Sequence, residues 1–237
     1  MAFHLNPSLD TATAARAFAG NRYVQIRDVF PDAVASKIHA TLADQTPWNL
    51  VFNDRGRHID IDGEQLASIP PAKRRELDQA IYAQARNGFQ YCYMNYPIYD
   101  AYQAGLNKDH LLHRLFEWLN GDEFLSFART VTQYADITNV DAQATRFLPG
   151  HFLSTHDDIA EGKKRRAAYI LNFTPEWSPD WGGYLQLLAD NGDVRVGLKP
   201  AFNRLNIIDI PQPHNVSLVT PFAAAGRYAI TGWLRHA

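Results

Sequence analysis

The sequence predicts a mainly β protein with helices, in which a helical N-terminal half supports a β sandwich or barrel in the C-terminal half. Three observations lead to this prediction. Before about residue 140, apolar residues recur at helical spacing between capping residues and glycines. After it, short runs of β-branched and aromatic residues alternate with proline, glycine and asparagine. These runs have the regular spacing of a sandwich or barrel and lack the helices that βαβ units require.

The helices expected in the first half are recognised by their ends. The first is Ala-rich, begins after Ser8 or Asp10 and stops at Gly20, because Ser and Asp side chains cap helix N-termini and glycine ends helices. An alternating strand, Arg22–Ile26, follows it. The remaining helices are expected at Asp32–Asp44, Pro71–Gly88, Leu111–Asn120 (capped by Asp109) and Asp122–Thr130.

Seven further strands are expected after residue 140. They cover Ala142–Leu148, Arg166–Phe173, Tyr184–Leu188, Val194–Leu198, Asn203–Ile210, Val216–Val219 and Arg227–Leu234. No repeat, low-complexity tract or linker interrupts the chain. We therefore expect one domain over residues 1–237, with residues 1–140 as support and residues 141–237 as the β core.

Composition excludes several classes of function. The net charge of −2 gives no electrostatic footprint for nucleic acid or for an anionic membrane. The single cysteine, Cys92, rules out an intrachain disulfide and a cysteine-based zinc cluster, and it suits a reducing compartment. The first residues lack a signal-peptide pattern, and no run reaches the roughly 20 apolar residues that span a bilayer. A soluble, cytoplasmic protein is expected.

The first candidate for chemistry is the sequence His156-Asp157-Asp158. Residues two apart on a strand point to the same face, so His156 and Asp158 are expected to offer an imidazole nitrogen and a carboxylate oxygen to one ion. A third ligand would complete the 2-His-1-carboxylate site of non-haem Fe(II) oxygenases. A second His-x-Asp, His58-Ile59-Asp60, follows a polar turn, and we interpret it as surface structure because no partner residues follow it at suitable spacing.

Two residues downstream strengthen the choice of His156. His214 stands at the start of a predicted strand, where it can reach across a barrel mouth to the His-x-Asp pair. Arg227 begins the last predicted strand. An arginine that points into an apolar barrel is costly unless a carboxylate meets it, and its planar fork binds carboxylates bidentately. A capping histidine and a surface arginine are the alternative interpretations of these two residues taken singly.

Five short motifs follow one another between residues 145 and 235. They are His156-x-Asp158, Tyr169-Ile170-Leu171-Asn172, Trp177 with Trp181-Gly182-Gly183, His214-x-Val216, and Arg227-x-Ala229-Ile230-x-Gly232-Trp233. The series resembles the prolyl-4-hydroxylase-type Fe(II)/2-oxoglutarate-dependent dioxygenases. The first 140 residues match that family only as a helical support.

The resemblance implies a double-stranded β-helix (jelly roll) with an iron site at its mouth. It implies Fe(II) ligation by His156, Asp158 and His214, and it implies that Arg227 binds the distal carboxylate of the cosubstrate 2-oxoglutarate. The pocket would be lined by Val216 and Trp233. The implied oxidoreductase reaction consumes dioxygen, releases succinate and carbon dioxide, and hydroxylates a C–H bond of free or peptidyl proline, with ascorbate as reductant.

Some positions depart from the family pattern. Asn172 stands where members often carry a tyrosine that bonds 2-oxoglutarate, and Asn172 is expected to donate in its place. Tyr184 replaces an acidic residue and is expected to point outward. The interval between His214 and Arg227 is long and contains the hairpin loop 222–226.

Two features bear on the substrate. The tyrosines at positions 91, 93, 96, 99 and 102 form either an aromatic wall for a substrate or packing between helices and barrel. The basic run 163–166 is either an attractant for an acidic substrate or a solvated hairpin tip. The sequence leaves the oligomeric state open. The alternatives to the oxygenase are a cupin-like metal protein that does not use oxoglutarate and a non-catalytic binding module.

Overall fold

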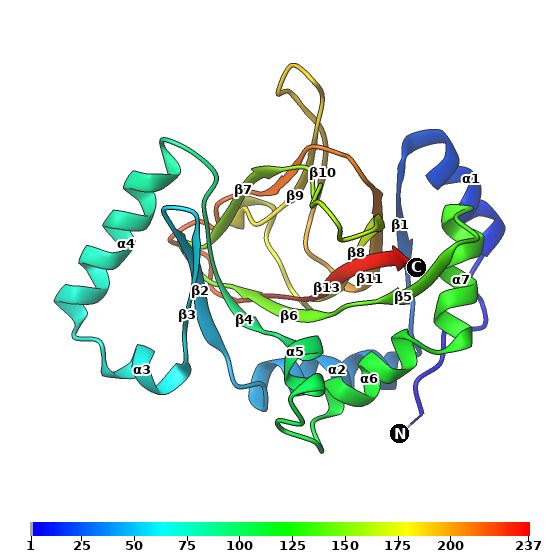
Figure 1. The fold of residues 1–237 in the computed structure, drawn as a ribbon, viewed down its shortest axis with the longest axis horizontal. Coiled ribbons are helices and arrows are strands. Elements are labelled where there is room, and N and C mark those ends of the chain that lie inside the picture. The colour runs from blue at the N-terminus through cyan, green and yellow to red at the C-terminus, as the bar shows by residue number, and fades with distance from the viewer. Residues whose placement is uncertain (1) are drawn as a thin grey trace.

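The computed structural model describes residues 2–237. Its helices are α1 (Thr11–Asn21), α2 (Asp32–Asp44), α3 (Gly63–Ser68), α4 (Pro71–Ala85), α5 (Ile98–Gln103), α6 (Leu111–Leu119) and α7 (Asp122–Thr132), with a 3-10 turn at Pro179–Trp181. Figure 1 shows a curled sheet with α2 and α6 running beneath it, α1 and α7 on one side, and α3 and α4 on the other. Within residues 2–237, no helix has the length and apolarity needed to cross a bilayer.

The strands form one antiparallel sheet in the order β1-β11-β8-β13-β6-β4-β7-β12-β9-β10, with β2 added to β4, β3 added to β2, and β5 added to β13. They are β1 (Tyr23–Arg27), β2 (Asn49–Asp54), β3 (Arg57–Ile61), β4 (Tyr91–Tyr96), β5 (Ile137–Val140), β6 (Gln143–Phe147), β7 (Phe152–His156), β8 (Arg165–Phe173), β9 (Leu185–Leu188), β10 (Val194–Leu198), β11 (Phe202–Asp209), β12 (His214–Val216) and β13 (Arg227–His236). The predicted fold class, a jelly-roll β core with supporting helices, is confirmed.

The predicted helices and strands are present with shifts at their ends, except that β12 (His214–Val216) shares only Val216 with the predicted strand Val216–Val219. Asp10, not Ser8, caps α1 by accepting a hydrogen bond from the Thr13 amide, and His110, not Asp109, caps α6. The helices α3 and α5 and the strands β2, β4 and β5 were not expected from the sequence. Strand β4 lies between β6 and β7, so a segment from the N-terminal half forms part of the barrel wall. Its pattern was hidden because both of its faces are buried in places, which removes a clean polar alternation.

Strand alternation separates the two faces of the sheet. On β8, Tyr169, Leu171 and Phe173 pack into the large core beneath the helices, whereas Ala168 and Ile170 face the barrel interior. Helix α6 meets that core with an apolar stripe at helical spacing, formed by Leu112, Leu115, Phe116 and Leu119. The helices therefore cover one face of the sheet, and the other face is left to form a pocket.

Glycine is required where the 3-10 turn enters β9. Gly182 has φ +66°, and an added Cβ would lie 2.0 Å from the Leu218 carbonyl oxygen. Gly192 also has a positive φ, +87°, but a Cβ there meets nothing within 4 Å. We expect Gly192→Ala to cost about 1 kcal/mol of unfolding free energy and Gly182→Ala about 3 kcal/mol, because only the second adds a backbone clash. Urea unfolding of the two variants tests this, and equal losses would contradict it.

His151 lies between β6 and β7, is 5% exposed, and has no hydrogen-bond partner for Nδ1 within residues 2–237. Burial lowers its pKa to about 4, and the charge of Arg74 adds to this effect. The unfolded chain therefore binds the proton more readily. We expect the contribution of His151 to the free energy of unfolding to be fully present above pH 6.5. As the pH falls toward 4, the free energy of unfolding is expected to decrease by about 3 kcal/mol. Urea unfolding across this range, compared with His151→Gln, measures it; parallel pH profiles would contradict it.

Candidate active site

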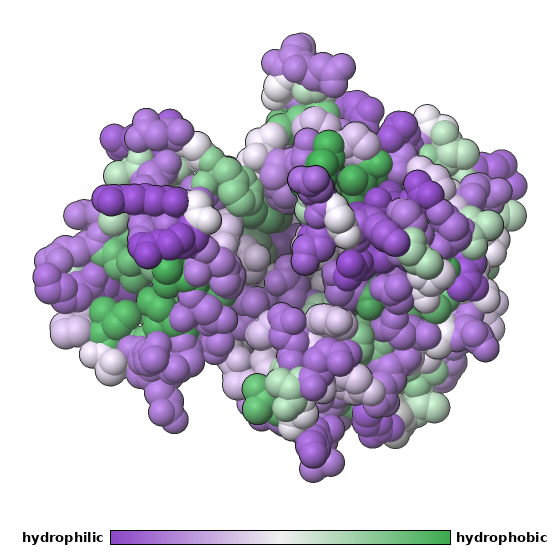
Figure 2. Space-filling model, viewed as in Figure 1, coloured by the Kyte–Doolittle hydropathy of each residue, from purple (hydrophilic) through white to green (hydrophobic). Residues whose placement is uncertain are grey.

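A cavity of about 80 Å³ opens at the mouth of the curled sheet. Its walls come from the inward faces of β4, β6, β7, β8, β9, β12 and β13. Figure 2 shows the molecular surface hollowed near the centre of this view, with a mainly hydrophilic rim. The cavity contains the predicted His-x-Asp pair, His214 and Arg227.

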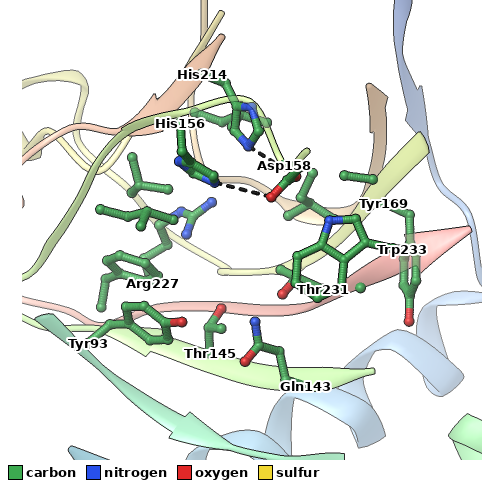
Figure 3. Close-up of a pocket in the computed structure, with 17 residues that line it drawn as sticks. Tyr93, Gln143, Thr145, His156, Asp158, Tyr169, His214, Arg227, Thr231 and Trp233 are labelled. Atoms are coloured by element: carbon green, nitrogen blue, oxygen red, sulfur yellow. Dashed lines mark ion pairs between the residues drawn. The ribbon is translucent and has the colours of Figure 1, made fainter. Parts of the chain in front are cut away.

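Three side chains meet on one side of this cavity (Figure 3). His156 Nε2 lies 3.4 Å from Asp158 Oδ1, and His214 Nε2 lies 3.5 Å from Asp158 Oδ2. One nitrogen or oxygen atom from each residue lies within 4.8 Å of those from the other two. His156 ends β7 and His214 begins β12, and the two are directly paired across these strands. Two imidazoles and a carboxylate facing one point are the donor set that suits Fe(II).

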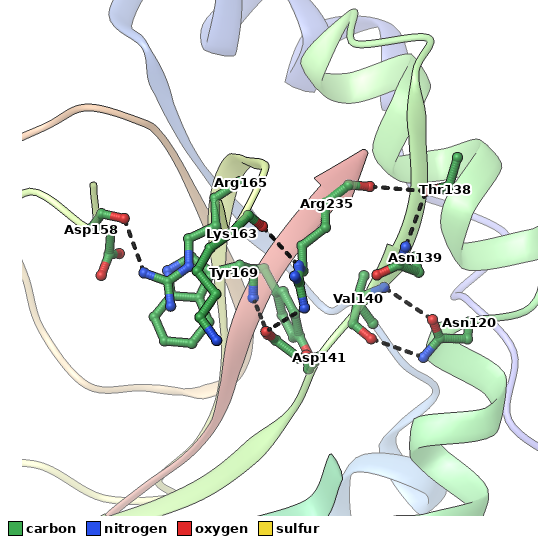
Figure 4. A network of polar contacts seen from close by, with 11 residues as sticks. Asn120, Thr138, Asn139, Val140, Asp141, Asp158, Lys163, Arg165, Tyr169 and Arg235 are labelled. Carbon is green, nitrogen blue, oxygen red and sulfur yellow. Dashed lines mark hydrogen bonds and ion pairs between the residues drawn. The ribbon is translucent and has the colours of Figure 1, made fainter. Parts of the chain in front are cut away.

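Asp158 reaches this point by a different route from the one predicted. Strand β7 ends at His156, so His156 and Asp158 do not lie on one strand face. Asp158 instead has a left-handed φ of 63°, which turns its side chain back toward the histidines. Arg165 holds this turn by donating a hydrogen bond of 3.0 Å from Nη1 to the Asp158 carbonyl (Figure 4). The Arg165 guanidinium itself lies 3.4 Å from the Trp233 ring centroid.

Backbone carbonyls orient both histidines. His156 Nδ1 donates to the Ser154 carbonyl at 3.0 Å, and His214 Nδ1 donates to the Gln212 carbonyl at 2.7 Å. A carbonyl only accepts, so these contacts place the proton on Nδ1 and leave the Nε2 lone pair directed at the common point. Such hydrogen bonds fix the tautomer and ring orientation of metal-ligating histidines.

The local charges favour the protonation states that a metal requires. Burial by itself would raise the pKa of Asp158, but the nearby His156 and His214 outweigh burial and lower the pKa. Burial also lowers the pKa of His214, and the neighbouring His156 lowers it further. An ionised carboxylate and a neutral imidazole are therefore favoured at neutral pH, and both are competent ligands.

Arg227 lines the same cavity. It is 2% exposed, and its Nε is buried without a hydrogen-bond partner among residues 2–237. Arg227 forms no ion pair within residues 2–237. Its guanidinium lies 4.9 Å from the Phe147 ring centroid. Burial lowers its pKa to about 10. A buried cation without an anion is costly, and a ligand carboxylate would compensate it.

Of the other residues discussed in the sequence analysis, two line the cavity and two do not. Val216 and Trp233 line the cavity as predicted. Asn172 is buried but does not line it, because its amide nitrogen is turned to the carbonyls of Ile170 and Arg204. Tyr184 lies outside the lining, and its hydroxyl donates to the Pro179 carbonyl.

Three polar lining residues were not expected from the sequence, namely Gln143, Thr145 and Thr231, and Tyr93 was expected only as one member of the tyrosine cluster. Thr145 and Phe147 alternate on β6, and Thr231 and Trp233 alternate on β13, so strand periodicity was the available signal. Tyr93 stacks on Phe147 with ring centroids 5.0 Å apart, and burial raises the pKa of its hydroxyl. Figure 3 shows the Tyr93 and Thr145 hydroxyls on the Arg227 side of the cavity.

The tyrosine cluster is partly an aromatic wall of the cavity and partly packing against helices, so each of the two interpretations holds for some of its members. Tyr93 faces the cavity, and the Tyr91 hydroxyl lies 2.7 Å from His58 Nδ1. Tyr96 contacts His113, and Tyr102 packs on Phe116 of α6. The second His-x-Asp is exposed on β3 and is not part of the group of three candidate ligands, in agreement with its interpretation as surface structure.

Comparisons with known proteins agree with this geometry. Residues 142–235 match the family model of the 2OG-Fe(II) oxygenase superfamily. The prolyl 3-hydroxylase OGFOD1 of Xenopus laevis is 32% identical over 130 residues, which cover 52% of this chain and 24% of that protein. The chain thus matches about a quarter of the length of this relative.

Two solved structures share the fold. A Pseudomonas putida prolyl-4-hydroxylase superposes with a TM-score of 0.54 at 15% identity, covering 96% of this chain and 99% of that one. A Trichoplax adhaerens prolyl hydroxylase, solved with a hypoxia inducible factor peptide fragment, gives 0.61 at 17% identity, covering 95% and 89%.

Proposed function

Because residues 142–235 belong to the 2OG-Fe(II) oxygenase superfamily, we propose that this chain is an Fe(II)- and 2-oxoglutarate-dependent dioxygenase that hydroxylates prolyl residues. The observation that supports it most directly is Arg227, a buried cation with no ion-pair partner among residues 2–237, in the cavity that also holds His156, Asp158 and His214. A cupin-like metal site that does not use oxoglutarate would leave this cation without a partner.

We assign the roles by position. His156, Asp158 and His214 hold Fe(II), which when bound supplies the redox chemistry that activates dioxygen. Arg227 binds the distal carboxylate of 2-oxoglutarate bidentately, and the Tyr93 and Thr145 hydroxyls are placed to add hydrogen bonds on the same side. Phe147, Val216 and Trp233 form apolar walls that exclude water from the reacting groups.

The substrate proposal is a proline-containing peptide, with ascorbate maintaining the reduced metal. It is supported by the 32% identity to a prolyl 3-hydroxylase and by the shared fold with a prolyl hydroxylase solved with a peptide. A cavity of about 80 Å³ leaves the rest of such a substrate outside, next to a groove of about 560 Å³ that shares Gln143, Thr231 and Trp233 with it.

The test is succinate formation from 2-oxoglutarate by the purified protein with Fe(II), oxygen and ascorbate. Succinate that disappears in His156→Ala supports the oxygenase. Absence of succinate, together with absence of joint Fe(II) and 2-oxoglutarate binding in anaerobic titration, would reject it in favour of a binding module. Mass spectrometry of a proline-containing peptide library, compared with free proline, then tests the substrate by a gain of one oxygen atom.

A further inference from the structure

A second and larger cavity, of about 650 Å³, lies on the other face of the wall formed by β6 and β13. It is bordered by α2, by the segment after β6, by Pro175 and Glu176, and by the loop 223–226. This loop belongs to the long interval between His214 and Arg227 noted in the sequence. The catalytic pocket uses none of these residues.

The two cavities stand back to back. Arg227 is paired with Phe147 across the strands, and Tyr228 is paired with Arg146. Neighbouring strand residues point to opposite faces, so the first pair lines the catalytic cavity and the second pair lines the other one. Each cavity thus has an arginine set against an aromatic ring on the same two strands.

Arg146 has no counter-charge within residues 2–237. Its guanidinium lies 5.3 Å from the Tyr228 ring centroid, and its Nε is buried with no hydrogen-bond partner in the part of the chain that the structure describes. Gly226 makes room for it, since a Cβ there would lie 3.1 Å from Arg146 Nε. His39 lines the same cavity, and its Nδ1 is also buried without a partner within residues 2–237.

A carboxylate lines the same cavity but does not neutralise the arginine. Glu176 is exposed there and forms no ion pair with Arg146 among the described residues. Separated groups of opposite charge are complementary to a ligand that carries both signs, whereas a dianion would be repelled by Glu176. Leu148, Ala223 and Tyr228 give the space between them an apolar lining.

We propose that this cavity binds a small zwitterion of the amino-acid type, with its carboxylate on Arg146, its ammonium group on Glu176 and its side chain on the apolar lining. The guanidinium fork matches a carboxylate bidentately, and its stack on Tyr228 pre-orients it. This site is independent of the iron chemistry and of the substrate groove.

The experiment uses three molecules of nearly the same shape. L-Leucine carries both charges, 4-methylpentanoate lacks the ammonium group, and 3-methylbutylamine lacks the carboxylate. Binding to the full chain, saturated anaerobically with Fe(II) and 2-oxoglutarate, is followed by calorimetry at millimolar ligand. We expect leucine to bind most tightly and to lose roughly tenfold to a hundredfold in affinity in Arg146→Gln.

Glu176→Gln tests the contact to the ammonium group separately from the contact to the carboxylate. It is expected to weaken leucine roughly tenfold and to leave 4-methylpentanoate unchanged or tighter. The proposal is overturned if none of the three molecules binds the wild-type protein, or if leucine binds wild type and Arg146→Gln equally. A circular dichroism spectrum and melting temperature of Arg146→Gln that match the wild type exclude loss of fold as the cause.

Discussion

Asp158→Ala is expected to lower kcat/KM for 2-oxoglutarate turnover by on the order of a thousandfold, equivalent to about 4 kcal/mol. Asp158 supplies the only carboxylate of the proposed iron site and approaches both histidines within 3.5 Å. Without it, two neutral imidazoles remain to hold a divalent cation. Succinate release measures turnover, and anaerobic Fe(II) titration measures metal binding.

The chain offers its own control for this prediction. Asp60 follows His58 at the same spacing, but both side chains are exposed on β3. Asp60→Ala is therefore expected to keep stoichiometric Fe(II) binding and uncoupled succinate formation. Equal losses in Asp60→Ala and Asp158→Ala would show that the wrong His-x-Asp has been assigned to the metal.

Arg227→Met is expected to weaken 2-oxoglutarate binding by about two to three orders of magnitude, because it removes the charge-assisted hydrogen bonds to the distal carboxylate. Fe(II) binding is expected to persist, since Arg227 is a cation and is not one of the three candidate ligands. Calorimetric titration of Fe(II)-loaded protein without oxygen measures the change. Arg204→Met is the matched control, because Arg204 bonds Gln25 outside the cavity lining.

The same substitution is expected to change stability in the opposite direction. In the ligand-free protein the buried guanidinium, which has no ion-pair partner among residues 2–237, destabilises the fold. Arg227→Met is therefore expected to have an unchanged free energy of unfolding or one higher by about 1–4 kcal/mol. 2-Oxoglutarate at a hundred times its dissociation constant should stabilise the wild type by about 2.7 kcal/mol and leave the variant unaffected. A ligand-free variant less stable than wild type by several kcal/mol would contradict this account.

Much of the fold was predictable because local patterns and tertiary packing agree. The spacing of Leu112, Phe116 and Leu119 predicts the buried face of α6, and the structure buries that face. Strand β4 escaped prediction because its residues are enclosed from both sides, a consequence of neighbours that are distant in sequence. Its tyrosines point either to the cavity or to the helices, because side chains alternate between the two faces of the strand. The local composition does not show which tyrosine faces which side.

At the site, the identity of the functional residues could be predicted from the sequence, whereas their backbone conformation and contacts could not. Residue chemistry and order singled out His156, Asp158, His214 and Arg227, and the structure brings all four to one cavity. The backbone route to Asp158 depends on a left-handed turn held by Arg165, and the orientation of Asn172 depends on a neighbouring strand. The cytoplasmic location and the use of ascorbate stay predictions.

Because His156 and His214 are directly paired, binding of iron by both histidines depends on the alignment of β7 with β12. A shift of one residue between β7 and β12 would turn one imidazole to the far side of the sheet, and the two rings would no longer share an ion. Molecules that fold with the wrong alignment therefore cannot be loaded. The iron-to-protein ratio of a preparation is then expected to measure the share of chains in which these two strands are correctly aligned.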